Sequence, residues 1–427
     1  MKLNSTNNKL NVVNLKEATL NSLPKDKGLY LPQEINSLDS AFINNLHLYS
    51  FPEISFRVAK NLIGEEIPAK DLEKICYKAI NFPAPIKKLT NQLYIQELFH
   101  GPSLAFKDFG ARFMAELMSY FISEENKKLT ILVATSGDTG GAVAAGFHNV
   151  ENIEVVILFP KDKVSPLQEL QLTTWGDNIK AIEVEGTFDD CQAMVKKAFL
   201  DPDLHEYNLS SANSINISRL IPQSFYYFEA VKQIGFDRKI SIAVPSGNIG
   251  NISAGSLARN MGLPIDTLVA AHNANNTIPL FYKSGEYNSK PSVSTISNAM
   301  DVGNPSNFPR YKTLNGSTWN NIKSQTLSYS YNDNETSIAL REIKEKYNYT
   351  SEPHAAVAFN SLKEKEINKD HNKIFLGTAH PAKFTEIVNN ILKEEIEIPQ
   401  SLLDLKNKES KKSAIQNYED FISWMLG

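Results

Sequence analysis

Lys107 is the residue of this sequence whose type and setting point most directly to chemistry. It lies at the centre of the stretch HGPSLAFKDFGARFM, which begins at His100, and it stands between Phe106 and Phe109. We expect these aromatic neighbours to remove water from the ammonium group. Desolvation disfavours the charged form of an amine and lowers its pKa, which suits a nucleophile or a Schiff-base partner. The alternative is a lysine at a helix start whose stem packs while its charge reaches water.

Two glycine-rich turns indicate anion binding. One covers residues 135–141 (TSGDTGG) and the other residues 246–250 (SGNIG), and each lies between an apolar stretch and a run of small residues. Such a turn lets backbone N–H groups approach an anion, and the dipole of the following helix favours negative charge there. Neither turn matches the P-loop or the dinucleotide-binding pattern. The two turns therefore predict a site for a phosphate or a carboxylate rather than for a nucleoside triphosphate or a dinucleotide.

A third polar segment, SSANSINISR, runs from Ser210 to Arg219 immediately before a predicted helix. A planar guanidinium with neighbouring amides and hydroxyls suits a phosphate or a carboxylate. The side chains concerned are those of Asn213, Ser214, Asn216, Ser218 and Arg219. The alternative, which the segment taken alone favours, is a polar loop with a helix cap.

Composition excludes several classes of function. The chain has 427 residues, 42% of them hydrophobic and 22% charged, with a net charge of −4. This length predicts two or three packed lobes, and the charge gives no sign of a nucleic-acid surface. No apolar run is long enough to span a bilayer, and the first residues lack the apolar core of a signal peptide. We therefore expect a soluble, cytoplasmic protein that binds neither nucleic acid nor membrane.

The histidines and cysteines do not predict a metal site. His100, His354 and His380 lie near turns that contain glycine or proline, without a zinc-binding spacing. Cys76 and Cys191 are far apart and form neither a metal spacing nor a disulfide framework. No Gly-x-Ser-x-Gly motif supports a serine hydrolase.

From about residue 91 onward, strands and helices alternate. Apolar strands are predicted at residues 129–134, 153–159, 179–184, 240–245, 267–271 and 374–377. Strands alternating with helices indicate parallel, doubly wound sheets, here divided between two lobes. The first 90 residues instead read as a module of short elements, punctuated by prolines.

Several helix boundaries are also predicted. Ser165 and Gln168 form a capping box for the helix that follows them, and Asp189 or Asp190 caps the next one. Residues 220–234 predict one amphipathic helix, residues 284–333 predict long loops, and residues 413–426 predict a closing helix.

Taken together, these stretches resemble the threonine synthase family, whose members are pyridoxal-phosphate enzymes of fold type II. Eight segments carry the resemblance, in the family's order and over most of the chain: HGPSLAFKDFGARF from His100, ATSGDTGGAVA from Ala134, LFPKDKVSPLQE from Leu158, SANSINISRL from Ser211, PSGNIG from Pro245, SNAMDVGNPSN from Ser297, TSEPHAAVA from Thr350 and GTAHPAKF from Gly377. The resemblance implies an α/β fold like that of the tryptophan synthase β subunit, with two doubly wound parallel-sheet lobes and a small N-terminal domain. The implied divisions are an N-terminal domain at residues 1–90, a two-lobed catalytic core at 91–395, and a C-terminal extension with a closing helix at 396–427.

The resemblance also assigns the cofactor site. Lys107 would hold pyridoxal 5'-phosphate in a Schiff base and act as the catalytic base, and Thr378 would face the pyridine nitrogen. Asp138 stands where the fold type often has an asparagine that contacts the cofactor's phenolic oxygen, and an aspartate could make that contact only with a shared proton. The cofactor's phosphate would lie on the turn formed by Ser246, Gly247, Asn248, Ile249 and Gly250, with Asn251 next in line.

The implied substrate is O-phospho-L-homoserine, and its conversion with water would give L-threonine and phosphate. Its carboxylate would lie on the turn formed by Thr135, Ser136, Gly137 and Thr139. Its phosphate would meet Asn213, Ser214 and Arg219, assisted by Thr139 and Asn248. Two alternatives within the same fold are a phospho-lyase that releases 2-oxobutyrate and a dehydratase. The small-molecule substrate is the expected partner, and the chain is expected to be a monomer or a homodimer.

Overall fold

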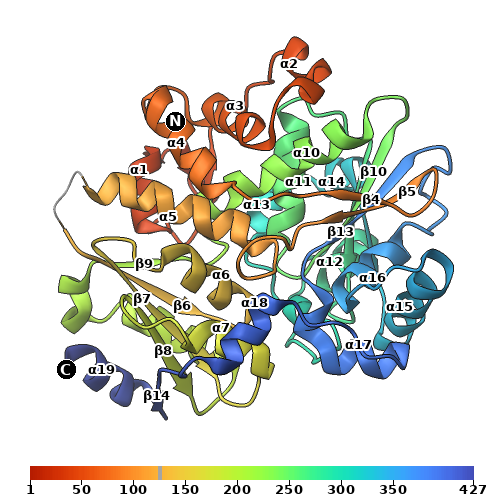
Figure 1. Ribbon diagram of the computed structural model, residues 1–427. Helices are drawn as coiled ribbons and strands as arrows, with labels where there is room; N and C mark the ends of the chain where they lie inside the picture. Colours follow the sequence, from red (N-terminus) through yellow and green to blue (C-terminus); the bar gives the residue numbers. More distant parts are fainter. Residues whose placement is uncertain (124–126) are drawn as a thin grey trace.

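The computed structural model describes residues 1–123 and 127–427 of the chain. Its N-terminal part combines a small antiparallel sheet with a group of helices, seen at the top of Figure 1. The sheet has the strand order β2-β1-β3, with β1 at Leu3–Ser5, β2 at Val12–Val13 and β3 at Tyr30–Pro32. The helices are α1 (Leu15–Asn21), α2 (Ser40–Asn44), η1 (Leu46–Leu48), α3 (Phe51–Ile63) and α4 (Ala69–Ala79).

A six-stranded sheet with its helices forms what we call the large lobe. The strand order is β12-β11-β10-β13-β5-β4, and only the pairing of β4 with β5 is antiparallel. The strands are β4 (Ile86–Lys88), β5 (Leu93–Glu97), β10 (Ile240–Pro245), β11 (Thr267–His272), β12 (Thr326–Ser330) and β13 (Asn372–Gly377). The helices around it include α9 (Ile217–Leu220), η3 (Ile221–Ser224), α10 (Phe225–Ile234), α11 (Gly250–Asn260), α12 (Thr277–Ser284), η4 (Asn298–Met300), α13 (Phe308–Leu314), α14 (Trp319–Gln325), α15 (Asp333–Tyr347), α16 (Pro353–Ser361), η5 (Pro381–Phe384) and α17 (Thr385–Leu392).

A five-stranded, fully parallel sheet with its helices forms the small lobe. The strand order is β14-β8-β7-β6-β9. The strands are β6 (Leu129–Ala134), β7 (Ile153–Pro160), β8 (Ile179–Val184), β9 (Leu209–Ser211) and β14 (Lys412–Ile415). The helices are α5 (Lys107–Ser123), α6 (Asp138–Phe147), α7 (Pro166–Thr173), α8 (Phe188–Ala198), η2 (Pro202–Tyr207) and α19 (Tyr418–Leu426).

Both sheets are covered on two faces, as a doubly wound fold requires. Successive strand residues point to opposite faces. In β6, Ile131 and Val133 join the core under α5 and α6, whereas Leu132 joins the core under α8 and α19. In β10, Ile242 and Ala243 likewise belong to different cores. Because a strand buried on both faces is mostly apolar, the runs at 129–134 and 240–245, each apolar apart from one hydroxyl residue, predicted these strands with their observed ends. The strand at 179–184 also has its predicted ends, although Lys180 is exposed and Glu183 is half-buried.

Two predictions about helices were wrong. Residues 220–234 are not one amphipathic helix, because α9, η3 and α10 follow each other with a 3-10 turn at Pro222, which lacks the N–H donor that a continuous helix needs. The aromatic residues at the start of α10 are buried on all sides rather than on one face. Asp189 and Asp190 do not cap α8, since Thr187 is the N-cap and Asp190 completes its capping box. The capping box of Ser165 and Gln168 at α7 is confirmed.

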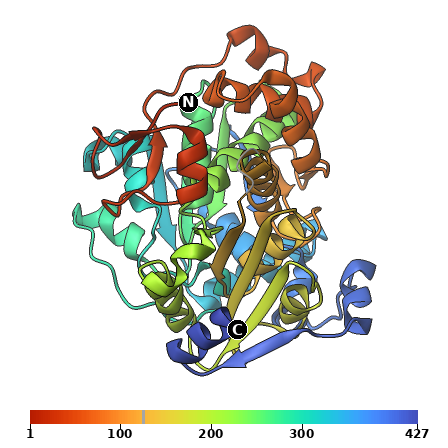
Figure 2. The ribbon, with the colours of Figure 1, turned by 90° about the vertical axis from the view of Figure 1, so that its left-hand side faces the viewer.

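The long loops and the closing helix were predicted only in part. Residues 284–333 contain α13, α14 and β12 as well as loops. The predicted closing helix starts later, at Tyr418, because residues 412–415 form β14 and pair with β8. The chain reaches β14 from the large lobe through α18 (Gln400–Leu403) and η6 (Asp404–Asn407), so its last residues complete the edge of the small sheet (Figures 1 and 2).

No helix in the described part of the chain is both long enough and apolar enough to cross a membrane.

Candidate active site

The predicted site residues gather at one edge of the two parallel sheets. The loop to Lys107 follows β5, residues 135–139 follow β6, residues 213–219 follow β9, residues 246–251 follow β10, and Thr378 follows β13. The carboxyl ends of parallel strands are where such sheets bind ligands. Five strands that are far apart in sequence therefore bring their polar ends to one place between the lobes.

Lys107 is the first residue of α5, and the loop before it is fixed to the end of β13. The backbone N–H of Phe106 donates to the carbonyl of Thr378 at 2.8 Å, and Ala105 forms an isolated bridge with Ala379. The Lys107 side chain is 17% exposed, and its Nζ lies 3.7 Å from the carboxylate of Asp138. Burial lowers the pKa of Lys107; Asp138 opposes this effect, while Lys383 and Arg219 add to it. The Lys107 side chain is thus largely shielded from water, with the ring centroid of Phe106 5.6 Å from its Nζ.

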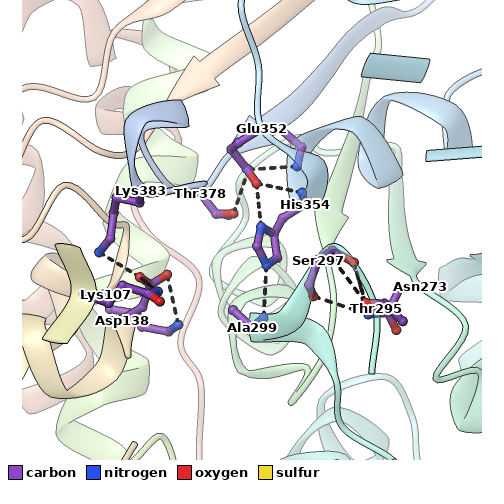
Figure 3. A network of polar contacts seen from close by, with 12 residues as sticks. Lys107, Asp138, Asn273, Thr295, Ser297, Ala299, Glu352, His354, Thr378 and Lys383 are labelled. Carbon is purple, nitrogen blue, oxygen red and sulfur yellow. Dashed lines mark hydrogen bonds and ion pairs between the residues drawn. The ribbon is translucent and has the colours of Figure 1, made fainter. Parts of the chain in front are cut away.

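Asp138 lies between two lysines rather than one (Figure 3). Its Oδ1 is 2.7 Å from the Nζ of Lys383 and accepts a hydrogen bond of 2.9 Å from the Nε2 of Gln168. Burial raises the pKa of Asp138, but the ammonium group of Lys383, joined by that of Lys107 whenever Lys107 is protonated, outweighs this effect and holds the pKa well below its usual range. An ionised carboxylate only accepts hydrogen bonds, so a proton shared with a cofactor oxygen would have to come from another group.

The turn at residues 135–141 is built around the hydroxyl of Thr135. Its Oγ1 accepts hydrogen bonds from the backbone N–H groups of Gly137 and Gly140, at 3.0 and 2.8 Å. Gly137 has a φ of 128°, which a side chain would strain. Helix α6 begins at Asp138, and its N-cap residue Gly137 offers no side-chain cap, so the N–H groups of Asp138 and Thr139 are available to an anion. Ser136 and Thr139 are half-buried at this end of the helix.

The turn at residues 246–250 leads into α11, which also begins without a side-chain cap. Ser246 is turned back into the protein, because its Oγ donates to the carbonyl of Val244 at 2.8 Å. Ile249 has a left-handed conformation, with a φ of 50°. A Cβ added to Gly247 would lie 2.7 Å from the Cα of Met300, so only glycine fits there. The close backbone approach and the uncapped helix start have the properties of a phosphate cradle.

Asn251 lies in the first turn of α11 and is held by two tyrosines. Its Oδ1 accepts from the hydroxyls of Tyr226 and Tyr227 at 2.8 and 2.7 Å. Its Nδ2 is buried, and no partner for it exists among the residues that the structure describes. Because a buried amide N–H is costly without an acceptor, Asn251 fits a site that an anion completes.

Ser214 is the centre of a polar cluster that joins two of the predicted segments. Its Oγ accepts hydrogen bonds from the amide groups of Asn248 and Asn307, at 2.8 and 3.1 Å. A hydroxyl has one proton to donate and two lone pairs to accept with. With both lone pairs used, the Ser214 proton is available to a further acceptor. Asn213 lies next to the first turn, where its Nδ2 donates to the carbonyl of Ala134 at 3.3 Å.

Arg219 is 3% exposed and lies against Gly110 of α5, where an added Cβ would come within 2.7 Å of its Nε. Its Nη1 donates to the carbonyl of Ala212. Its Nε is buried without a partner in residues 1–123 and 127–427. Burial lowers the pKa of Arg219 to about 10, against the attraction of Asp108. Such a guanidinium retains donors for an anion.

Asn216 and Ser218 do not belong to the site. The Nδ2 of Asn216 donates to Thr19 and Ser22 of the N-terminal part, and its Oδ1 accepts from the backbone and hydroxyl of Ser218. These two residues fix the segment to its neighbours, which was the alternative for this stretch.

Arg310 holds the backbone of the segment at residues 214–215 by hydrogen bonds, and sequence reasoning did not identify it. Its guanidinium is fully buried and donates to the carbonyls of Tyr30, Ser214 and Ile215. Burial lowers the pKa of Arg310 to about 9. No local spacing reveals this contact, because the atoms it joins come from three distant parts of the chain.

Thr378 belongs to a second polar network (Figure 3). Its hydroxyl lies 3.5 Å from the carboxylate of Glu352, and that carboxylate is 2.5 Å from the Nδ1 of His354. The Nε2 of His354 accepts from the backbone N–H of Ala299 at 3.1 Å, in the turn that faces Gly247. Thr378 is thus tied to the turn at residues 246–250 through one chain of contacts.

This set of groups fits pyridoxal phosphate better than a metal. An amine with a lowered pKa, a glycine cradle at an uncapped helix start and the unpartnered amide of Asn251 suit an aldehyde-bearing phosphate. In the described residues, no group of three or more histidine, cysteine or acidic side chains could hold a metal ion. Residues 79–377 match the family model described as pyridoxal-phosphate dependent enzyme. The chain is therefore a pyridoxal-phosphate-dependent enzyme with the α/β architecture of fold type II.

The remaining comparisons define the particular family. Residues 2–80 match the model for the threonine synthase N terminus, and residues 355–422 match its C-terminal model. Threonine synthase of Escherichia coli (strain K12) is 43% identical over 409 residues, covering 95% of this chain and 94% of the relative. The crystal structure of threonine synthase from Escherichia coli covers 100% of this chain and 99% of its own, with a TM-score of 0.92 and 40% identity. The X-ray structure of PLP-bound threonine synthase from Brucella melitensis covers 99% and 98%, with a TM-score of 0.93 and 34% identity. The chain belongs to the threonine synthase family.

Proposed function

We propose that the chain converts O-phospho-L-homoserine and water into L-threonine and phosphate. The reaction removes phosphate from the γ-carbon of the substrate and adds water at the β-carbon. The observation that carries this proposal is the candidate anion site of Arg219, whose buried Nε has no partner in the described residues, and Ser214, whose Oγ already accepts two hydrogen bonds and keeps its proton for an acceptor. A substrate without phosphate has no use for such a site.

Lys107 is the residue that holds the cofactor and moves protons. When bound, pyridoxal phosphate supplies an electron sink for negative charge at the substrate carbons. The lowered pKa of Lys107 supports this role, because an uncharged amine can form the covalent link and can take the α-proton once released. Its place at the start of α5, between Asp138 of the small lobe and the end of β13 in the large lobe, supports the same role.

The cofactor's phosphate is assigned to the turn of Ser246, Gly247, Asn248, Ile249 and Gly250. The uncapped start of α11 and the close packing of Gly247 against Met300 support this assignment. Asn251 contributes its unpartnered amide.

Two further residues are assigned to the cofactor ring. Thr378 would face the pyridine nitrogen, and its hydroxyl lies 3.5 Å from the carboxylate of Glu352. Asp138 would lie near the phenolic oxygen as an ionised group, and a neighbouring ammonium would supply the proton between them.

The substrate is assigned to the two polar segments that follow β6 and β9 in the small lobe. The turn of Thr135, Ser136, Gly137 and Thr139 binds its carboxylate through backbone N–H groups at the start of α6. Its phosphate meets Asn213, Ser214 and Arg219, with the Ser214 proton and the free donors of Arg219 pointing to such a ligand. Holding both ends of the substrate between the lobes excludes bulk water until phosphate has left.

The division of the chain stays a proposal, with residues 1–90 as the N-terminal domain, 91–395 as the catalytic core and 396–427 as the C-terminal extension. The cytoplasmic location and the choice between monomer and homodimer likewise remain predictions.

The test is a product balance with O-phospho-L-homoserine as the substrate. The purified chain is supplied with pyridoxal phosphate, and phosphate, threonine and 2-oxobutyrate are measured in the same mixture. We expect one threonine for each phosphate released. Release of 2-oxobutyrate in place of threonine would show that the chain is a phospho-lyase. Release of no phosphate would show that O-phospho-L-homoserine is not the substrate.

A further inference from the structure

Lys383 is a buried lysine that the proposed reaction does not yet use. It lies in η5, five residues after Thr378 at the end of β13 in the large lobe, and its side chain is fully buried. Its Nζ is 2.7 Å from Asp138, at the start of α6 in the small lobe, and donates to the carbonyl of Ser103 at 2.8 Å. The ion pair therefore crosses the junction of the two lobes next to Lys107 (Figure 3).

Buried charges on four elements surround Lys107. Asp138 lies on α6, Lys383 on η5, Arg219 on α9 and Asp108 on α5 itself. The charges of Asp138, Lys383 and Arg219 act on Lys107. Asp108 interacts with both Lys383 and Arg219, and burial raises the pKa of Asp108 to about 6. These neighbours therefore comprise two basic and two acidic side chains.

The charges of these four side chains determine whether the site stabilises the protonated or the uncharged form of Lys107. With Lys383 and Arg219 charged, the two carboxylates are already neutralised, so a protonated Lys107 would leave an uncompensated positive charge in a buried site. Uncompensated buried charge is strongly unfavourable. Without Lys383, the carboxylate of Asp138 at 3.7 Å would instead stabilise the ammonium form of Lys107.

We propose that Lys383 is a positioning residue for Lys107: by binding Asp138 across the lobe junction, it neutralises that carboxylate and keeps the Lys107 amine uncharged and nucleophilic. This role rests on the proposed use of Lys107 as the cofactor-binding amine. It predicts an effect on the amine itself, separate from any effect on turnover. The alternative is a purely structural ion pair that joins the lobes and leaves the titration of Lys107 unchanged.

The test measures how the amine of Lys107 titrates in the full-length chain after hydroxylamine has removed the cofactor. Cyanate carbamylates uncharged amines, and peptide mass spectrometry gives the rate at Lys107 as a function of pH. Exposed Lys239 serves as the internal reference. In the wild type we expect the Lys107 midpoint to lie below that of Lys239. A midpoint equal to that of Lys239 would overturn the proposal without any variant.

Three variants test the direction in which the Lys107 midpoint shifts. In Lys383→Met, whose side chain has a similar length, the Lys107 midpoint should rise by about one pH unit, a tenfold change in the protonation equilibrium. In Asp138→Asn it should fall, and in the double variant it should return towards the wild-type value. The control is Lys232→Met, which removes a partly buried lysine from its 3.1 Å pair with Glu229 at another site and should leave Lys107 unchanged.

Circular dichroism identifies variants that fold. If Lys383→Met does not fold, a wild-type Lys107 midpoint equal to that of Lys239 would still refute the proposal. An unchanged Lys107 midpoint in folded Lys383→Met would refute the proposal, as would a shift of the same sign in all three variants. The product balance is measured separately on the wild type, so failure of the proposed reaction is distinguishable from failure of this inference.

Discussion

Gly247→Ala tests whether the turn at residues 246–250 is the rigid cradle that the structure indicates. The new Cβ would lie 2.7 Å from the Cα of Met300 and 3.2 Å from its carbonyl carbon and oxygen, whereas ordinary contact begins at 3.4 Å. The shortfall of about 0.7 Å involves backbone atoms, which cannot rotate away. The turn that carries Met300 is itself held by the contact between Ala299 and His354. The turn at residues 246–250 must therefore move.

Overpacking of this kind costs about 1–3 kcal/mol. If the cost falls on the cradle, the dissociation constant of pyridoxal phosphate rises by about 5- to 150-fold, since about 1.4 kcal/mol corresponds to a factor of ten. Absorbance titration of the cofactor-free chain gives the affinity, and thermal unfolding gives the stability without cofactor.

The matched control is Gly141→Ala. Its Cβ would meet its nearest neighbour at an ordinary 3.4 Å inside helix α6, where alanine is preferred over glycine by about 0.5–1 kcal/mol. This variant should be at least as stable as the wild type. Wild-type affinity and stability in Gly247→Ala would show that the turn is not constrained by Met300, and the cradle assignment would fail.

Two other substitutions test the buried charges. Arg219→Met should raise KM for O-phospho-L-homoserine by about 30-fold, equivalent to about 2 kcal/mol of lost charge-assisted hydrogen bonding; an unchanged KM in steady-state kinetics would remove Arg219 from the phosphate site. Asp108→Asn should change how stability depends on pH, because burial raises the pKa of Asp108 from 3.8 to about 6. A carboxyl group with a raised pKa contributes stability that is present below pH 4 and is lost as the pH rises through 6, by about 3 kcal/mol. The variant should therefore gain about that much relative to the wild type between pH 4 and pH 7 in denaturant unfolding, and parallel pH profiles would contradict the shift.

The sequence predicted those features that depend on local pattern. Strands 129–134 and 240–245 are largely apolar runs bounded by polar or charged residues, and burial on both faces favours such runs. The capping box of Ser165 and Gln168 needs only a spacing of three residues. Lys107 was recognised because its aromatic neighbours are adjacent in sequence.

Features that depend on distant contacts could not be predicted in this way. Residues 412–415 form a strand because β8 offers an open edge, although the segment itself resembles the start of the helix that follows. Lys383 is an ordinary lysine in sequence, and only folding brings it to Asp138 and Ser103. The contacts of Arg310 with Tyr30 and with the segment at residues 214–215 arise in the same way.

The role of Lys107 can be measured most directly by locating the covalent link to the cofactor. Borohydride reduces the carbon–nitrogen double bond between pyridoxal phosphate and a lysine, and the modified peptide is then identified by mass spectrometry. Two buried lysines, Lys107 and Lys383, lie on either side of Asp138, so the experiment separates them. We predict the pyridoxyl group on Lys107, with Lys383 unmodified. A pyridoxyl group on Lys383 or on any other lysine, with Lys107 unmodified, would contradict the assignment of the site.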